Sequence, residues 1–138
     1  MQAISHAPTV SSSKLWIGRI MSFLPALFLI ADAVMKFVKP AFVVDANVQL
    51  GYGENVIVPI AAVLLVSTIL YLIPRTAVLG AILLTGYLGG AVATHVRVGA
   101  GVFPIAFAIV FGVLLWGGLY LRDPRVSALI PLSKPIVA

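Results

Sequence analysis

The chain has 138 residues, of which 62% are hydrophobic and only 9% are charged, and its mean hydropathy is +1.16. A soluble domain carries about 25% charged residues, so too few charges remain to coat a globule of this size. The absence of cysteine excludes disulfides, thiol chemistry and cysteine-ligated metal centres. The net charge of +5 does not indicate a nucleic acid partner, because the basic residues occur singly near the ends of apolar runs.

Four apolar stretches account for most of the sequence. They cover residues 16–37, 56–73, 76–95 and 103–121. Each has about the 20 residues that a helix needs to cross the hydrocarbon core of a bilayer. The sequence therefore predicts an all-α integral membrane protein, a four-helix bundle whose membrane domain covers residues 15–122. We expect a flexible polar tail over residues 1–14 and a C-terminal tail over residues 123–138.

The segment between the first two stretches has helix signals of its own. Pro40 can begin a short helix and Gly51 can end one. Between them, the apolar side chains of residues 41–50 fall near one face at helical spacing. We expect a short helix at the membrane interface, with an irregular loop as the alternative.

The basic residues predict the orientation of the bundle. An even number of spans places both termini on one side, which also receives the tight turn at Pro74 and Arg75. That side collects Lys14, Arg19, Arg75, Arg122, Arg125 and Lys134, whereas the other side has Lys36, Lys39 and Arg97. The positive-inside rule then predicts that both termini lie in the cytoplasm.

Small residues at four-residue spacing indicate where helices approach closely, because packing rather than water must join helices inside lipid. The residues at this spacing in the third and fourth spans are Gly86, Gly89, Gly90, Ala93, Ala108 and Gly112. We expect them to pack within one chain, with a dimer interface as the alternative. Tyr71 and Trp116 lie near span ends, where aromatic side chains often form a belt at the membrane surface.

Ionisable residues within the spans are the first candidates for a site. Asp32 lies one helical turn before Lys36, an arrangement that favours an ion pair. Two interpretations stay open for this pair. It stabilises the end of a helix, or its carboxylate faces a cavity and binds a ligand or carries a proton.

His95 and Arg97 end the third span on the same side of the membrane as Asp32. Because His95 is the only residue of the spans that titrates near neutral pH, it is a candidate for proton exchange. The predicted ligand site consists of Asp32, Lys36, Thr85, Tyr87, His95 and Arg97. We expect no metal site, because His95 stands alone and no metal-ligand spacing occurs. No catalytic motif is present, so no residue is assigned a catalytic role.

Three segments resemble the DoxX-like family of small bacterial membrane proteins. They are residues 31–36 (ADAVMK), 50–52 (LGY) and 71–97 (YLIPRTAVLGAILLTGYLGGAVATHVR). The resemblance covers roughly residues 17–120 and implies a four-helix bundle that crosses the bacterial inner membrane several times. The wider family is named for a membrane subunit of a thiosulfate–quinone oxidoreductase, so the resemblance also implies quinone as a candidate cofactor.

Three functions are compatible with these features. The leading hypothesis is a membrane protein without a self-contained catalytic site, and so not an enzyme on its own. It would bind membrane lipid or another apolar ligand, or support a partner membrane protein or a second copy of itself. The alternative is a membrane subunit of a quinone-linked oxidoreductase, in which Asp32 or His95 exchanges protons and Tyr87 and Trp116 line the pocket. A small oligomeric transporter is the third hypothesis.

Overall fold

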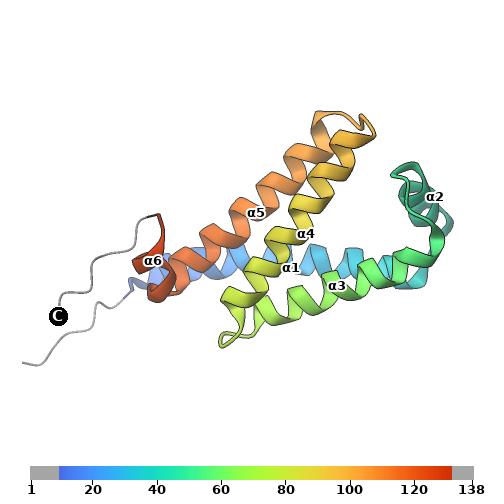
Figure 1. Ribbon diagram of the computed structural model, residues 1–138. Coiled ribbons are helices and arrows are strands. Elements are labelled where there is room, and N and C mark those ends of the chain that lie inside the picture. Colours follow the sequence, from blue (N-terminus) through green and yellow to red (C-terminus); the bar gives the residue numbers. More distant parts are fainter. Residues whose placement is uncertain (1–9, 132–138) are drawn as a thin grey trace, which may run out of the picture.

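The computed structural model describes residues 10–131, and all of the regular secondary structure within them is helical (Figure 1). The helices are α1 (Ser12–Val38), α2 (Ala41–Gln49), α3 (Glu54–Leu72), α4 (Ala77–Arg97), α5 (Val102–Arg122) and α6 (Pro124–Leu129). Four of them, α1, α3, α4 and α5, are long and apolar enough to cross a membrane. The predicted all-α fold with four spans is confirmed.

The first span begins earlier than the sequence indicated. Helix α1 starts at Ser12, inside the segment that was assigned to the N-terminal tail, because Ser11 caps it by accepting a hydrogen bond from the backbone N–H of Lys14. It ends before Pro40, as expected. In the C-terminal segment, Asp123 caps the short helix α6. The remaining parts of the predicted tails, residues 1–9 and 132–138, lie outside the described residues.

Residues 41–49 form the short helix α2, so the alternative of an irregular loop is wrong. Pro40 precedes the helix with an extended backbone, and Gly51 follows it with a φ of 84°. The N–H of Gly51 donates to the carbonyl oxygen of Val48 (2.9 Å), and the N–H of Tyr52 donates to that of Asn47 (3.0 Å). These two bonds satisfy carbonyl groups that the end of a helix leaves free.

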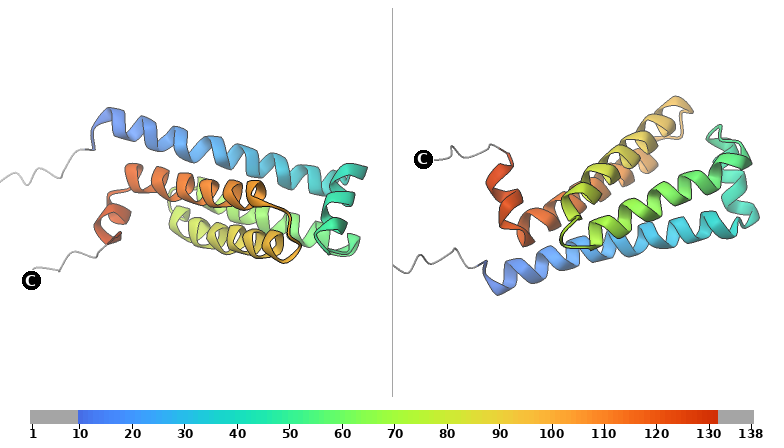
Figure 2. Two further views of the ribbon diagram at one scale, coloured as in Figure 1. Left: turned by 90° about the horizontal axis from the view of Figure 1, so that it is seen from above. Right: turned by 60° about the horizontal axis from the view of Figure 1, so that its bottom comes forward.

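The four long helices form two pairs that diverge. Helix α1 lies beside α3, α4 lies beside α5, and α1 also contacts α5 while α3 contacts α4. The two pairs are close where α1 begins and α5 ends, and they separate toward the end that carries α2 (Figures 1 and 2). We call these the α6 end and the α2 end of the bundle. Because α1 begins and α5 finishes at the α6 end, an even number of spans returns the chain to the side where it started.

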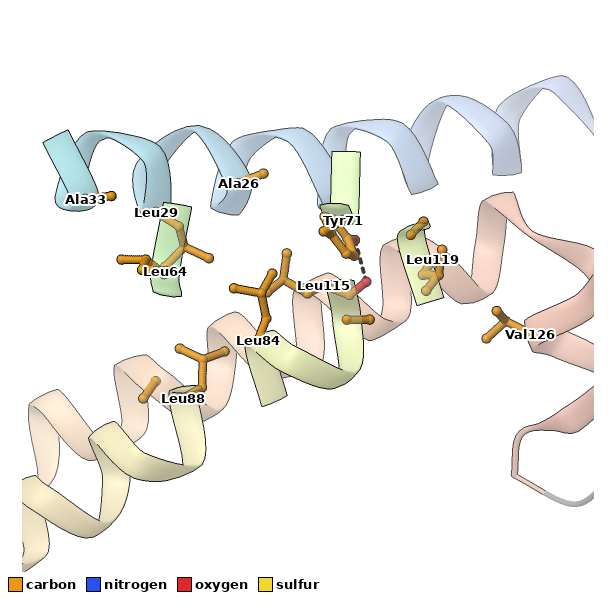
Figure 3. Packing of buried hydrophobic residues seen from close by; sticks show 13 residues of the cluster. Ala26, Leu29, Ala33, Leu64, Tyr71, Leu84, Leu88, Leu115, Leu119 and Val126 are labelled. Carbon is orange, nitrogen blue, oxygen red and sulfur yellow. Dashed lines mark hydrogen bonds between the residues drawn. The ribbon is translucent and has the colours of Figure 1, made fainter. Parts of the chain in front are cut away.

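Tyr71 joins the pairs near the α6 end (Figure 3). Its side chain, near the end of α3, is fully buried. The hydroxyl donates to the carbonyl oxygen of Leu115 on α5 (2.6 Å) and lies 2.9 Å from the Oγ of Ser22 on α1. The guanidinium of Arg122 lies over the ring, 5.2 Å from its centroid. The expectation that Tyr71 belongs to a surface belt is therefore wrong, because its hydroxyl finds buried partners on two other helices.

The closest helix contacts occur at small residues that the sequence analysis did not select. A Cβ on Gly18 of α1 would lie 2.9 Å from the carbonyl oxygen of Gly118 on α5, and one on Gly80 of α4 would overlap the backbone of Tyr71. Gly18, Ser22 and Ala26 are buried and follow one another at four-residue intervals along α1. That spacing is the sequence signal that could have identified the α1–α5 contact.

The predicted packing residues fall into two groups. Ala108 is buried, and a Cβ on Gly112 would meet Leu88 at 3.8 Å, so both lie at the contact between α4 and α5. A Cβ on Gly86, Gly89 or Gly90 would meet no atom within 4 Å. These three glycines are exposed and make no close contact within the chain, so the alternative of a contact with another helix stays open.

Candidate functional site

Asp32 and Lys36 form an ion pair within α1, as their spacing indicated. The Lys36 side chain is only 12% exposed, because it shares the face of α1 that buries Leu29 and Ala33. The lysine therefore lies against the bundle instead of extending to the membrane surface. Tyr87 of α4 is partly buried against the apolar core, and no hydrogen bond within the described residues joins it to this pair.

A second ion pair joins the end of α1 to the start of α3. The Nζ of Lys39 lies 3.6 Å from the Oε1 of Glu54, and both side chains are partly or largely exposed. An exposed pair of this kind contributes little to stability, about 0–1 kcal/mol. The carboxylates Asp32 and Glu54 thus each neutralise a lysine on or just after α1.

The last turn of α4 is tied to the connection between α2 and α3. The guanidinium of Arg97 donates to the carbonyl oxygen of Leu50 (2.8 Å), and the hydroxyls of Tyr52 and Thr94 share a hydrogen bond (2.8 Å). His95 bonds within its own helix, with Nδ1 2.7 Å from the carbonyl oxygen of Ala91. No direct bond in the described structure joins His95 or Arg97 to Asp32 or Lys36.

The six predicted site residues therefore do not form one cluster. Asp32 and Lys36 pair within α1, Tyr87 packs against the apolar core, and His95 and Arg97 lie at the end of α4. Thr85 is elsewhere, since ten residues of helix separate it from His95, which is about 15 Å. Its hydroxyl donates to the carbonyl oxygen of Ala81 (2.7 Å) and accepts from the indole N–H of Trp116 (2.7 Å).

Thr85 and Trp116 border a groove between α4 and α5. The groove has a volume of about 360 Å³ and opens toward the outside of the bundle. Its other lining residues are Leu88, Gly89, Val92, Ala108, Ile109, Gly112 and Val113. The lining is almost wholly apolar, because the two polar side chains bond to each other.

The outer face of α4 continues from this groove. Gly86, Gly90 and Ala93 are exposed there, between the exposed apolar side chains of Ile82 and Val96. Along this stripe of small residues, which we call the glycine face, no side chain extends beyond a Cβ atom. Because it lies within a candidate membrane span, the glycine face contacts lipid or another membrane helix.

No group of three or more His, Asp and Glu side chains within residues 10–131 is arranged to hold a metal ion. Six ionisable side chains near the α2 end, namely Asp32, Lys36, Lys39, Glu54, His95 and Arg97, instead pair with each other or with backbone carbonyls. What the arrangement offers chemically is an apolar lateral surface in the membrane and a polar region at one end of the bundle.

These features define a small multi-pass membrane protein whose accessible surfaces in the bilayer are apolar. The family model described as the DoxX-like family matches residues 20–118, which is most of the chain. The protein therefore belongs to the DoxX-like family. Comparison with curated proteins and with solved structures finds no match.

Proposed function

We propose that this protein supports another membrane protein by binding one of its helices along the outer face of α4. The observation that carries the proposal is the open space beside Gly86, Gly89 and Gly90, where an added Cβ would meet nothing within 4 Å. The protein then acts as a binding module and has no self-contained catalytic site.

The energetic argument concerns the cost of glycine in a helix. Each glycine disfavours a helix by about 1 kcal/mol relative to alanine. Gly80 and Gly118 offset that cost by allowing close contact within the chain, whereas Gly86 and Gly90 make no such contact. In lipid, small residues four apart favour association by letting two backbones approach. A partner helix would supply the contact that the chain itself does not.

The α4–α5 groove gives this face its shape. It adjoins the glycine face through Gly89. Its volume of about 360 Å³ is enough for several apolar side chains of a partner or for part of a lipid chain. A lipid chain is the alternative ligand for this groove. A flexible hydrocarbon chain packs less closely against an exposed glycine backbone than a second helix does. A second copy of the chain is one form that the partner helix can take.

A quinone site in the α4–α5 groove has less support. The quinone hypothesis needs a proton-exchanging group at the pocket, but the groove is lined by neither Asp32 nor His95. Only Trp116 of the residues expected around a quinone borders it. A membrane subunit of a quinone-linked oxidoreductase remains the alternative function, and an oligomeric transporter has no specific observation in its favour.

The charges support a location in a bacterial inner membrane with both termini in the cytoplasm. The α6 end carries Lys14, Arg19, Arg75, Arg122 and Arg125, against the single acid Asp123. At the α2 end, Lys36, Lys39 and Arg97 are matched in number by Asp32, Asp45 and Glu54. This excess of basic residues at one end follows the positive-inside rule.

The test is co-purification from native membranes in mild detergent, followed by native mass spectrometry. The variant Gly86→Leu/Gly90→Leu places two large side chains on the glycine face without removing a contact inside the chain. The control Ala106→Leu makes the same kind of change on an exposed position of α5. We expect a partner helix or second copy to remain with the native protein and the control and to be lost from the double variant.

Equal recovery of the same partner with all three proteins would contradict the proposal. Recovery of a stoichiometric lipid or quinone, with no protein partner, would favour the ligand-binding alternatives instead. Circular dichroism of each purified protein establishes that the helices are intact, so a lost partner is not the result of unfolding.

A further inference from the structure

A second hollow lies at the α2 end of the bundle. It has a volume of about 360 Å³ and lies where the end of α2 faces the connection between α4 and α5. Gln49 and Leu50 line one side, His95 and Val98 line another, and Pro104 completes the wall. We call this hollow the α2 cleft; its walls come from α2, from the end of α4 with the connection that follows it, and from the start of α5.

The cleft offers hydrogen-bond acceptors. The Nδ1 of His95 lies 2.7 Å from the carbonyl oxygen of Ala91, and a carbonyl can only accept, so Nδ1 carries the proton. In the neutral ring, Nε2 is then the acceptor that is left for a ligand. Gln49 also lines the cleft, and its side-chain amide can accept as well as donate.

The C-terminal ends of two helices add a partial negative charge to the cleft. Helix α2 ends at Gln49 and helix α4 ends at Arg97, and the residues that follow each helix, Leu50 and Val98, both line the cleft. The carbonyl end of a helix carries a partial negative charge and favours cations. Asp45, one turn before Gln49 on α2, belongs to none of the ion pairs of the described residues.

A positive group stands on the rim of the same cleft. Arg97 donates one N–H to Leu50, a lining residue, and its guanidinium lies next to Gly51. No carboxylate of the described residues lies within 4 Å of it. The side chain is exposed, so its other N–H groups are accessible. The cleft therefore presents acceptors inside and a cation at its edge.

A complementary ligand carries a positively charged hydrogen-bond donor next to a negatively charged group. Since the cleft lies at the ends of two membrane spans, it is at the level of lipid headgroups. We propose that the α2 cleft binds the headgroup of a phospholipid that carries a primary ammonium group. The ammonium donates to the acceptors of His95 and Gln49, the phosphate pairs with Arg97, and the first carbons of the acyl chains contact Val98 and Pro104.

Native mass spectrometry of the purified full chain with defined lipids tests this assignment. Three lipids with identical acyl chains are compared, carrying phosphoethanolamine, phosphocholine or phosphoglycerol headgroups. Phosphocholine has the same charge as phosphoethanolamine but no N–H donor. We expect one phosphoethanolamine lipid per chain, bound at least about tenfold more tightly than the phosphocholine lipid, since charged hydrogen bonds are lost. Equal retention of these two lipids would overturn the proposal.

Two substitutions test whether the lipid binds in the α2 cleft. His95→Phe removes the acceptor, and Ala100→Phe fills the cleft from its α4–α5 side. Both should abolish the preference for the phosphoethanolamine lipid, whereas Lys39→Gln, a charge change at the same end but outside the cleft lining, should keep it. An unchanged preference in both cleft variants, with helicity preserved, would refute the site.

The soluble headgroup distinguishes the source of the ligand. Phosphoethanolamine without acyl chains is added to the lipid-free protein at increasing concentration. Binding that requires the intact lipid supports a membrane occupant, and equally tight binding of the soluble compound would overturn it. The Gly86→Leu/Gly90→Leu variant separates this inference from the proposed partner helix, because that variant should lose the partner and keep the lipid.

Discussion

The two ends of the bundle are held together by different interactions. At the α6 end, the backbones of α1 and α5 meet at Gly18 and Gly118, and a buried tyrosine bonds to two other helices. At the α2 end, the helix pairs have separated, and single polar contacts such as Tyr52–Thr94 connect them. The comparison shows that close packing is concentrated at one end, which leaves the other free to form a cleft.

The largest effect should come from Gly80→Ala. The added Cβ would overlap the backbone of Tyr71, so α3 and α4 must move apart, and we expect a loss of about 3 kcal/mol in the free energy of unfolding. Gly86→Ala makes the same change on the same helix in open space, and should leave monomer stability unchanged or raise it by up to about 1 kcal/mol. Chemical denaturation in detergent measures the free energy of unfolding of both variants. Equal changes in the two variants would contradict the conclusion that Gly80 is closely packed and Gly86 is not.

A smaller effect is expected for Tyr71→Phe. The change removes the hydroxyl that bonds to Leu115 and lies beside Ser22, and it leaves the ring in place. We expect destabilisation by about 1 kcal/mol, which is typical of a buried hydrogen bond between membrane helices. Tyr120→Phe is the matched control, since Tyr120 is exposed. Equal thermal stability of these two variants would contradict the interpretation that the Tyr71 hydroxyl connects the two helix pairs.

Tyr52→Phe should have a local consequence at the α2 end. The variant removes the bond to Thr94, and the neighbouring Arg97–Leu50 bond remains. Global stability should change by less than about 1 kcal/mol. Hydrogen exchange should accelerate in the peptides that cover α2 and the end of α4. Faster exchange spread over all four spans would show that both ends unfold as one unit.

The smallest effect should be confined to α6. Hydrogen bonds from the Arg125 side chain hold the pKa of Asp123 below its usual range, against the opposing effect of its partial burial. Because the folded-state pKa is lowered, the stabilisation is present above the ordinary pKa of about 4 and is lost as the pH falls through the lower folded value. Asp123→Ala should loosen α6 by about 0.5 kcal/mol at pH 7. Hydrogen exchange across residues 124–129 checks this, with Ser127→Ala as the control.

Much of the fold follows from local signals in the sequence. The spans were predictable because a bilayer sets the length of an apolar helix. The short helix α2 was predictable because Pro40 favours a helix start and Gly51 accepts a positive φ. The Asp32–Lys36 pair was predictable because it is contained within one helical turn.

The direction in which each helix face points could not be predicted in the same way. In a soluble helix, polarity distinguishes the outer face from the core, but here the membrane is as apolar as the interior. Gly80 and Gly86 therefore look alike in the sequence, although one is packed against Tyr71 and the other faces outward. The separation of His95 from Asp32 likewise depends on how the two pairs diverge, which no local pattern encodes.

The divergence of the helix pairs also gives the protein a wedge shape across the bilayer (Figure 2). The bundle occupies more area in the leaflet at the α2 end than in the leaflet at the α6 end. We therefore expect the width of the α2 cleft to respond to the lateral pressure of the lipids that surround the wider end.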